Sequence, residues 1–394
     1  MSEITDLIRE KSAAIYSKVK GYREYLHQNP ELSYQEFETM KYVSKVLTGL
    51  TISHQTEVGK TGVVAIIRND KHAEDASCIG LRSDLDALPI QEENEISFKS
   101  TKAGVMHACG HDVHTAILLG VAEILNEMKD LLPLPVKLIF QPGEEKNPGG
   151  ATLMIADGVL HNPEIKEMYA LHVFPDMPVG KVGFKEGLYM ASCDEIYVTI
   201  NGKGGHGATP NQCIDPIVIG ATIVTQLQQI VSRKCDPKTP CVLSFGHFEA
   251  IGATNIIPSK AILKGTFRTM NEEWRAEALK LIEFQIKHIV ESQGGTVQIE
   301  ISKGYPYLEN DPEVTSRLKM KAQKYLGNAF VEDMPIRLTS EDFAFYSQEI
   351  PVCFFRLGVR NEEKGIIYGV HHPKFNIDDN ALKIGLEMMA LAAF

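Results

Sequence analysis

Short apolar runs alternate with amphipathic segments along the first half of the chain. Between two of these runs, residues 112–128 carry apolar side chains at helical spacing, and Asp112 is expected to be the N-cap of that helix. Strand–helix–strand order of this kind predicts a mostly parallel sheet in a three-layer α/β/α domain. The expected strands cover residues 62–68, 78–88, 136–142 and 167–175.

The pattern of apolar and polar positions changes near residue 190. From there the expected order is strand, helix, strand, strand, helix, strand, which is the order of a ferredoxin-like sandwich. The α/β pattern then resumes, with residues 352–359 as a late strand. We therefore expect a main catalytic domain in two parts with an α+β domain inserted between them. The expected ranges are 1–187 and 304–394 for the main domain and 188–303 for the insertion.

The composition narrows the class of protein. The 394-residue chain is 44% hydrophobic and 23% charged, as in ordinary globular proteins, and its net charge of −11 argues against a nucleic-acid-binding surface. No stretch approaches the roughly 18 apolar residues of a membrane span, and the charged N-terminus lacks the apolar core of a secretory signal. Seven scattered cysteines without a C-x-x-C pair fit a reducing compartment. We expect a cytoplasmic protein that binds neither nucleic acid nor membranes.

Candidate metal ligands gather where the expected strands end. In open parallel sheets, ligands bind beyond the carboxyl ends of the strands. Imidazole and carboxylate suit zinc or manganese, and a thiolate favours zinc. Of two adjacent glutamates, one can bind metal and the other can act as general base, but chemistry alone does not assign them. The candidates are Asp84, Asp86, Glu144, Glu145, His172, His371 and His372, and the segment GVMHACGHDVHTA adds His107, Cys109, His111, Asp112 and His114.

The histidine-rich segment admits other chemistry. A zinc finger fails on spacing, because no second C-x-x-C or H-x₃₋₅-H pair follows. Cys109 as a thiol nucleophile stays open, and such an enzyme would keep its activity under chelation.

Nine segments in a fixed order resemble the co-catalytic metallopeptidase and amidohydrolase family that includes aminoacylase and glutamate carboxypeptidase. They are REYLHQNPELSYQEFET, LRSDLDALPIQE, MHACGHDVHTA, QPGEE, ALHVFPDMPVG, GKGGHGATPNQCIDPI, NIIPSKAILKGTFRT, SEDFAFY and HHPKF. The branch that they resemble most is that of hippurate hydrolase, indole-acetyl-amino-acid hydrolase and N-acyl-amino-acid amidohydrolase. The resemblance implies a zinc-peptidase-like catalytic domain, with the insertion as a lid through which two copies form a homodimer.

The resemblance also implies two divalent ions per subunit, Zn²⁺ or Mn²⁺. Glu144 corresponds to the general base and Asp86 to a carboxylate that orients a ligand imidazole. His206 corresponds to a lid histidine that polarises the scissile carbonyl, usually from the partner subunit. Asn255 and Arg268 correspond to lid residues that hold the substrate's carboxylate, for which the planar fork of an arginine is suited. The implied metal ligands are Cys109, His111, Glu145, His172 and His371.

The implied reaction is hydrolysis of an N-acyl-amino acid by a water that the metals activate, with Glu144 as general base. A dipeptidase or carboxypeptidase of the same family is the first alternative, and it differs only in the acyl pocket. A non-catalytic metal-binding scaffold is the second, and the intact Gly-Glu-Glu sequence argues against it. His371 and His372 could exchange roles, as could Glu144 and Glu145. We expect supporting roles for His107 and His114.

Overall fold

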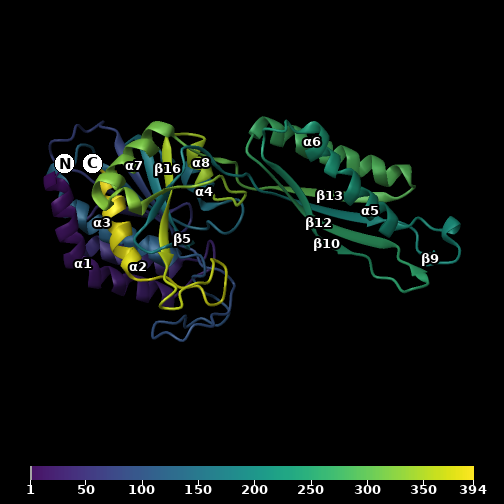
Figure 1. Ribbon diagram of the computed structural model, residues 1–394, viewed down its shortest axis with the longest axis horizontal. Coiled ribbons are helices and arrows are strands. Elements are labelled where there is room, and N and C mark those ends of the chain that lie inside the picture. The colour runs from purple at the N-terminus through teal and green to yellow at the C-terminus, as the bar shows by residue number, and fades with distance from the viewer. Residues whose placement is uncertain (1) are drawn as a thin grey trace. The chain divides into compact units, whose positions relative to one another are not determined.

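The computed structural model describes residues 2–394, and the chain divides into two compact units (Figure 1). Unit 1 contains the chain up to Tyr189, Glu309–Ile336 and Phe345–Phe394. Unit 2 contains Met190–Leu308 and Arg337–Ala344. The second segment of unit 2 is tied to its beginning by the backbone, because Ala191 N–H donates to the carbonyl of Arg337 over 3.1 Å.

An eight-stranded mixed sheet forms the centre of unit 1, in the order β1-β2-β4-β3-β5-β16-β6-β15. Neighbours among β4, β3, β5 and β16 are parallel, whereas β2 is antiparallel to β1 and β4, and β6 to β16. The predicted α/β fold around a large, mostly parallel sheet is therefore confirmed in the central strands. The strands are β1 (His54–Val58), β2 (Gly62–Ile67), β3 (Cys78–Asp84), β4 (Val136–Gln141), β5 (Ile165–Pro178), β6 (Val182–Phe184), β15 (Val331–Asp333) and β16 (Val352–Arg360).

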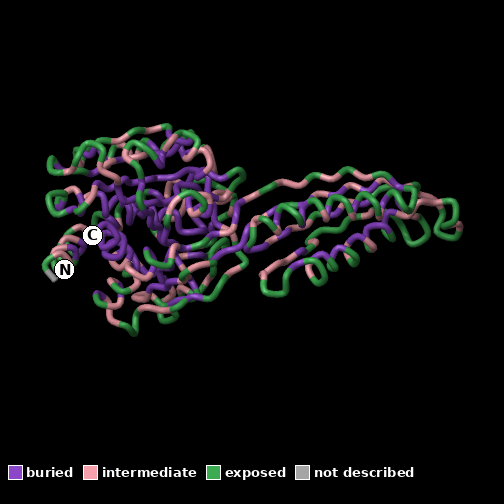
Figure 2. Tube along the Cα trace, turned by 90° about the horizontal axis from the view of Figure 1, so that it is seen from above, coloured by how far each residue is buried: buried purple, intermediate pink, exposed green. Residues whose placement is uncertain are grey.

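Helices and sheet share one large apolar core in unit 1 (Figure 2). Every residue of β3 and β4 is buried, as expected for central parallel strands. Alternate side chains of β4, such as Leu138 and Phe140, face the core that the helices contribute to. No helix within residues 2–394 is long and apolar enough to cross a membrane. The helices are α1 (Ser2–Gln28), α2 (Phe37–Gly49), α3 (His111–Glu127), α4 (Gly150–Ala156), α7 (Pro312–Leu326), α8 (Ala344–Ser347) and α9 (Asn380–Ala392).

The predicted N-cap of α3 is wrong. The helix begins at His111, and the cap position is Gly110, with a φ of 88° and no side-chain cap bond. Glycine adopts this left-handed conformation without the steric cost that other residues meet. The carboxylate of Asp112 is buried and bonds elsewhere, 2.9 Å from His27 Nδ1 and 3.4 Å from Arg23 Nε.

Unit 2 is built on a four-stranded antiparallel sheet in the order β10-β12-β8-β13. With two helices, it has the strand–helix–strand–strand–helix–strand order predicted from the sequence, plus the short pair β9 and β11. One face of β8 is buried against the helices and the other is half-buried or exposed. The elements are β8 (Asp194–Asn201), β9 (Gly205–His206), α5 (Pro216–Gln226), β10 (Cys241–Glu249), β11 (Ile256–Ile257), β12 (Lys260–Thr269), α6 (Glu272–Ser292) and β13 (Thr296–Lys303).

Candidate metal centre

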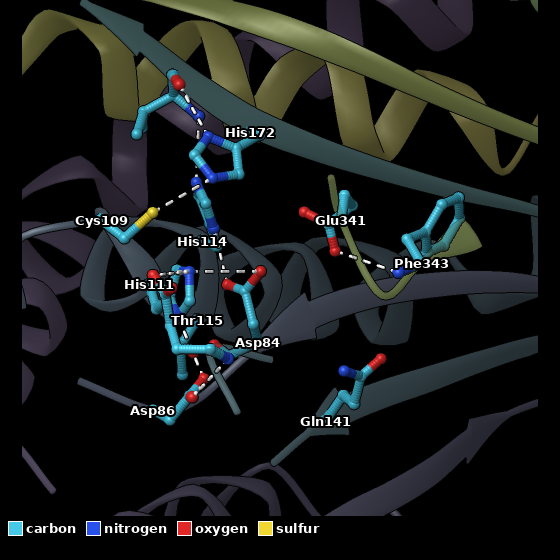
Figure 3. Close-up of polar contacts among 12 residues, drawn as sticks. Asp84, Asp86, Cys109, His111, His114, Thr115, Gln141, His172, Glu341 and Phe343 are labelled. Atoms are coloured by element: carbon cyan, nitrogen blue, oxygen red, sulfur yellow. Dashed lines mark hydrogen bonds and ion pairs between the residues drawn. The ribbon is translucent and has the colours of Figure 1, made fainter. Parts of the chain in front are cut away.

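Potential metal ligands from four segments of unit 1 meet beyond the carboxyl ends of the parallel strands. Figure 3 shows three of them, Cys109, His111 and His172, close together. The ligand atoms of Cys109, His111 and His172 lie within 4.8 Å of one another, and so do those of Cys109, Glu145 and His371. Cys109 precedes α3 and His172 lies in β5, and the Cys109 Sγ to His172 Nε2 distance is 3.4 Å. The thiol of Cys109 belongs to both groups, so it would be a ligand in either of them.

The buried donor atoms fit a cation. Among residues 2–394, Nε2 of His111 and Oε1 of Glu145 have no hydrogen-bond partner, although buried polar atoms nearly always have one. These two atoms are 3.9 Å apart. His371 Nε2 lies 3.2 Å from the same glutamate oxygen without hydrogen-bond geometry. A divalent ion would satisfy these atoms, and thiol, imidazole and carboxylate are ligands that such ions take.

The charges around the site also favour a cation. Burial acts to lower the pKa of His111, but Asp84, Asp86 and Glu145 raise it to about 10. These carboxylates therefore create a strong preference for positive charge. The pKa of His172 lies well below its usual value because of burial and the neighbouring His114, which keeps the ring neutral. Its Nδ1 donates to the carbonyl of Val173 over 2.7 Å, so the lone pair of Nε2 is left for the site.

Asp86 holds two parts of the site in place. One of its oxygens lies 3.1 Å from Nδ1 of His111, which fixes the ring with Nε2 toward the site. The other accepts bonds from Ser33 Oγ at 2.6 Å and from the backbone N–H of Glu145 at 2.9 Å. Asp86 thus orients one potential ligand through its ring and another through its backbone.

We expect Asp86→Asn to weaken metal binding roughly 10- to 100-fold, the usual effect of losing a partner of a ligand imidazole. The amide cannot accept from all three donors as the carboxylate does. Titration against a chromophoric chelator measures the affinity. Ser33→Ala is the matched control, since it removes one bond to Asp86 and leaves the His111 bond intact. Wild-type affinity in Asp86→Asn would show that Asp86 does not orient a ligand.

Both ring nitrogens of His114 bond within the protein. Its Nε2 accepts from Val173 N–H at 3.0 Å, so Nδ1 carries the proton and donates to Asp84 over 2.6 Å. Arg82 also bonds to Asp84, at 2.7 Å. Burial acts to raise the pKa of Asp84, but His111, His114 and Arg82 hold it well below its usual value. Asp84 and His114 lie near His111, but their bonds within the protein make them poor ligands.

The two remaining histidines of the predicted set differ. His107 is buried without a partner for either ring nitrogen within the described residues, and burial lowers its pKa to about 4. It is therefore neutral and is not in a potential ligand group. His372 stacks on Tyr368 at 4.4 Å and its Nδ1 accepts from Lys374 N–H, whereas His371 has a φ of 66° and lies beside Glu145. The structure favours His371 over His372 as a ligand.

The loop with Glu144 and Glu145 is held by residues that the sequence analysis did not identify. Gly143 has a φ of 58°, and its N–H donates to Glu36 Oε1 over 2.8 Å. Tyr34 donates to the carbonyl of Lys146 over 2.7 Å. A Cβ on Gly143 would lie 2.3 Å from the ring of Tyr34. This close approach requires glycine before the glutamate pair.

We expect Gly143→Ala to lower the free energy of unfolding by roughly 2–4 kcal/mol, because it adds a steric overlap to an unfavourable φ. Gly104→Ala is the control, since Gly104 has a φ of 74° but nothing within 4 Å of its Cβ position. It should cost roughly 1–2 kcal/mol. Urea unfolding of both variants measures the difference. Equal losses of stability would mean that the ring of Tyr34 moves away from the added methyl group at no cost in free energy.

The predicted lid residues lie in unit 2. His206 is exposed in β9, which pairs with β11, and Asn255 directly precedes β11. The carbonyl of Asn255 accepts from the N–H of Gly207 at 2.8 Å. Arg268 is near the far end of β12, where Nη1 donates to the carbonyl of Leu338 over 3.0 Å. Unit 2 therefore brings His206 and Asn255 together, and it holds Arg268 apart from them.

An α/β sheet with a buried thiol, imidazole and carboxylate cluster at its ligand-binding edge, next to a second glutamate, defines a metal-dependent hydrolase. Comparison with known proteins gives the family: residues 80–394 match the model of peptidase family M20/M25/M40, and the chain belongs to this family. The family predicted from the sequence is therefore confirmed, and the protein is a metal-dependent amidohydrolase.

Three known proteins illustrate how similar this chain is to its relatives. Thermostable carboxypeptidase 2 of Saccharolobus solfataricus is 39% identical over 374 residues, covering 94% of this chain and 93% of that protein. N-acetyl-L-cysteine deacetylase of Bacillus subtilis is 37% identical over 362 residues, covering 92% and 84%. The crystal structure of Bacillus subtilis YXEP, a dinuclear metal binding peptidase of the M20 family, is 33% identical with a TM-score of 0.79, covering 97% and 98%. This likeness supports two divalent ions in the present protein.

Proposed function

We propose that the protein hydrolyses the amide bond of N-acyl-amino acids and releases an acid and an amino acid. The observation that carries this proposal is the position of Glu144, whose carboxylate lies within 4.8 Å of ligand atoms of His111 and Glu145. The similarity to an N-acetyl-L-cysteine deacetylase supports the substrate class. The two ions are Zn²⁺ or Mn²⁺, and the residues that would hold them are Cys109, His111, Glu145, His172 and His371.

The residues divide the reaction among them. When bound, the divalent ions acidify a water and polarise the substrate carbonyl. Glu144 accepts the proton of the attacking water and then delivers it to the nitrogen of the leaving amine. His206 donates a hydrogen bond to the developing oxyanion. Asn255 and Arg268 bind the carboxylate of the amino acid, and Arg268 can do so with two parallel bonds.

A second copy of the chain supplies part of each site in this proposal. Asn255 and His206 lie beside β11, which precedes β12 in the chain, and Arg268 lies eight residues beyond Lys260, roughly 26 Å along β12 at about 3.3 Å per residue. One copy of unit 2 is too long to present both ends to one small substrate. Exposed apolar side chains on unit 2 support a homodimer with unit 2 as its lid and interface: Ile217, Val218, Phe248, Ile251 and Ile256.

Mixing two inactive variants tests whether His206 acts in the partner's site. Glu144→Gln and His206→Ala homodimers are each expected to lose most activity. After subunit exchange, mixed dimers regain one complete site, formed by Glu144 of one copy and His206 of the other. We expect roughly a quarter of wild-type activity after equal mixing, if exchange is random. No recovery, with exchange shown by mass-tagged subunits, would place His206 in its own subunit's site.

A substrate panel tests the proposed function. With added Mn²⁺ or Zn²⁺, N-acetyl- and N-benzoyl-amino acids should be hydrolysed with a kcat/KM at least about tenfold above that of dipeptides, since a mismatched pocket contact costs this much. A preference for peptides would favour the second candidate, a carboxypeptidase or dipeptidase, which the similarity to a thermostable carboxypeptidase supports. No turnover of either class with full metal content would favour a metal-binding scaffold.

We also propose a cytoplasmic location, with small molecules rather than nucleic acids or membranes as ligands. All seven cysteines are free thiols, which supports a reducing compartment. The net charge of −11 opposes binding to polyanions.

A further inference from the structure

A groove of 590 Å³ in unit 1 lies at the opposite ends of the strands from the metal centre. Ile79, near the start of β3, lines it, and β3 ends at Asp84. Lys166, near the start of β5, also lines it, and β5 leads to His172. At about 3.3 Å per residue, five or six residues separate the groove from the metal centre by roughly 17–20 Å. The groove is therefore a separate site.

The floor of the groove is apolar. Leu134, Met320 and Phe394 line it, and Met320 on α7 is 59% exposed. Figure 1 shows α7 beside the C-terminal end of the chain. A smaller cavity of 60 Å³ shares Phe394 and continues toward Ile4. Exposed apolar surface of this kind, bordered by charged side chains, is typical of a ligand groove.

The rim of the groove carries more cations than acids. Arg317 forms an ion pair with Glu167, so its charge is balanced. By contrast, Lys166, Lys321 and Lys324 have no ion-pair partner in residues 2–394, in a chain whose net charge is −11.

Lys321 is the cation that most needs an anion. Its Nζ has one polar contact, 3.5 Å from the carbonyl of Leu391. Burial and the charge of Arg317 lower its pKa, and the charge of Glu167, which is paired with Arg317, only partly offsets them. An anion beside the Lys321 ammonium group would compensate for the solvation that this group loses on burial.

We propose that this groove binds an amphiphilic carboxylate, a single anionic head with an apolar chain or ring. The carboxylate lies between Lys321 and the exposed ammonium groups of Lys166 and Lys324. The apolar part covers Leu134, Met320 and Phe394. A head group alone would leave the apolar floor in water, and an uncharged chain would leave the lysines unpaired. The site does not depend on the proposed reaction.

Calorimetric titration with decanoate tests the proposal. Titration with phenylacetate shows whether an aromatic ring can replace the apolar chain, and titration with acetate measures the binding of the carboxylate head alone. We expect decanoate or phenylacetate to bind and acetate to bind far more weakly. Lys321→Gln/Lys324→Gln should weaken binding by at least about tenfold, the usual loss when hydrogen bonds between charged groups are removed. Lys319→Gln is the matched control, because Lys319 is on the same helix but pairs with Asp333 outside the groove.

A metal centre can itself accept a carboxylate, so His371→Ala is titrated in parallel. The proposal requires that His371→Ala keeps decanoate binding and that Lys321→Gln/Lys324→Gln keeps the wild-type kcat and thermal midpoint. Binding that is lost in His371→Ala and kept in the lysine variant would overturn it. So would wild-type protein that binds neither decanoate nor phenylacetate.

Discussion

Replacement of Glu144 by glutamine is expected to lower kcat by roughly a thousandfold, within the 10²- to 10⁴-fold range that general-base catalysis contributes. The amide keeps the size of the side chain but cannot take a proton from water. Glu144 is buried directly after Gly143, and its carboxylate lies within 4.8 Å of His111 and Glu145 ligand atoms. The metal content of the Glu144→Gln variant should remain that of the wild type. Steady-state kinetics and metal analysis of the same preparation measure both quantities.

Glu145→Gln is the matched control for this substitution. Glu145 has a buried oxygen without a hydrogen-bond partner in residues 2–394, next to both His111 and His371. Its replacement should therefore lower kcat together with metal content, and excess metal should restore part of the activity. Excess metal should not rescue Glu144→Gln. If Glu144→Gln loses metal and Glu145→Gln retains it, the two glutamates have exchanged roles.

Local patterns were sufficient to predict the central elements of the fold. Strands β3 and β4 are buried along their whole length, so their sequences are apolar enough to recognise without knowing their neighbours. The edge strand β1 was not predicted, because four of its five residues are polar or charged and its place depends on pairing with β2. The wrong prediction of Asp112 as N-cap also arises from contacts that are distant in the sequence. Its side chain bonds to Arg23 and His27, which are far away in the sequence.

The sequence indicated candidate ligands that the structure brings together, but it indicated less about the residues that hold them. Strand ends and the nine family segments indicated Cys109, His111 and Glu145. Glu36 lies in the first of these segments, but the segment did not indicate its role, because its bond to Gly143 spans 107 residues. Burial and the charge of Asp86 raise the pKa of Glu36 to about 7, which shows how closely it is packed into the site. Ionisable residues of this kind become recognisable only when the chain is folded.

Removal of metal by EDTA is expected to lower turnover at least about a hundredfold, and added Mn²⁺ or Zn²⁺ should restore it. The buried donors near Glu144 are not strong nucleophiles themselves. Glu144 would therefore activate a water, and a water becomes a strong nucleophile at neutral pH only beside a cation. The fold should survive chelation, because unit 1 has a large apolar core that does not include the donor residues His111, His172 and Glu145. Far-ultraviolet circular dichroism of the chelated protein is the control for unfolding.

The same experiment decides between metal chemistry and the thiol chemistry that the sequence left open for Cys109. Burial raises the pKa of Cys109 well above its usual value, and the charges of Glu145 and Glu144 act in the same direction. Without a cation the sulfur is therefore a neutral thiol, which is a weak nucleophile. His172 is 3.4 Å from the sulfur, but its own pKa is lowered, so it provides no positive charge to stabilise a thiolate. Full activity in EDTA, with loss of metal shown by analysis, would reverse this conclusion and make Cys109 the nucleophile.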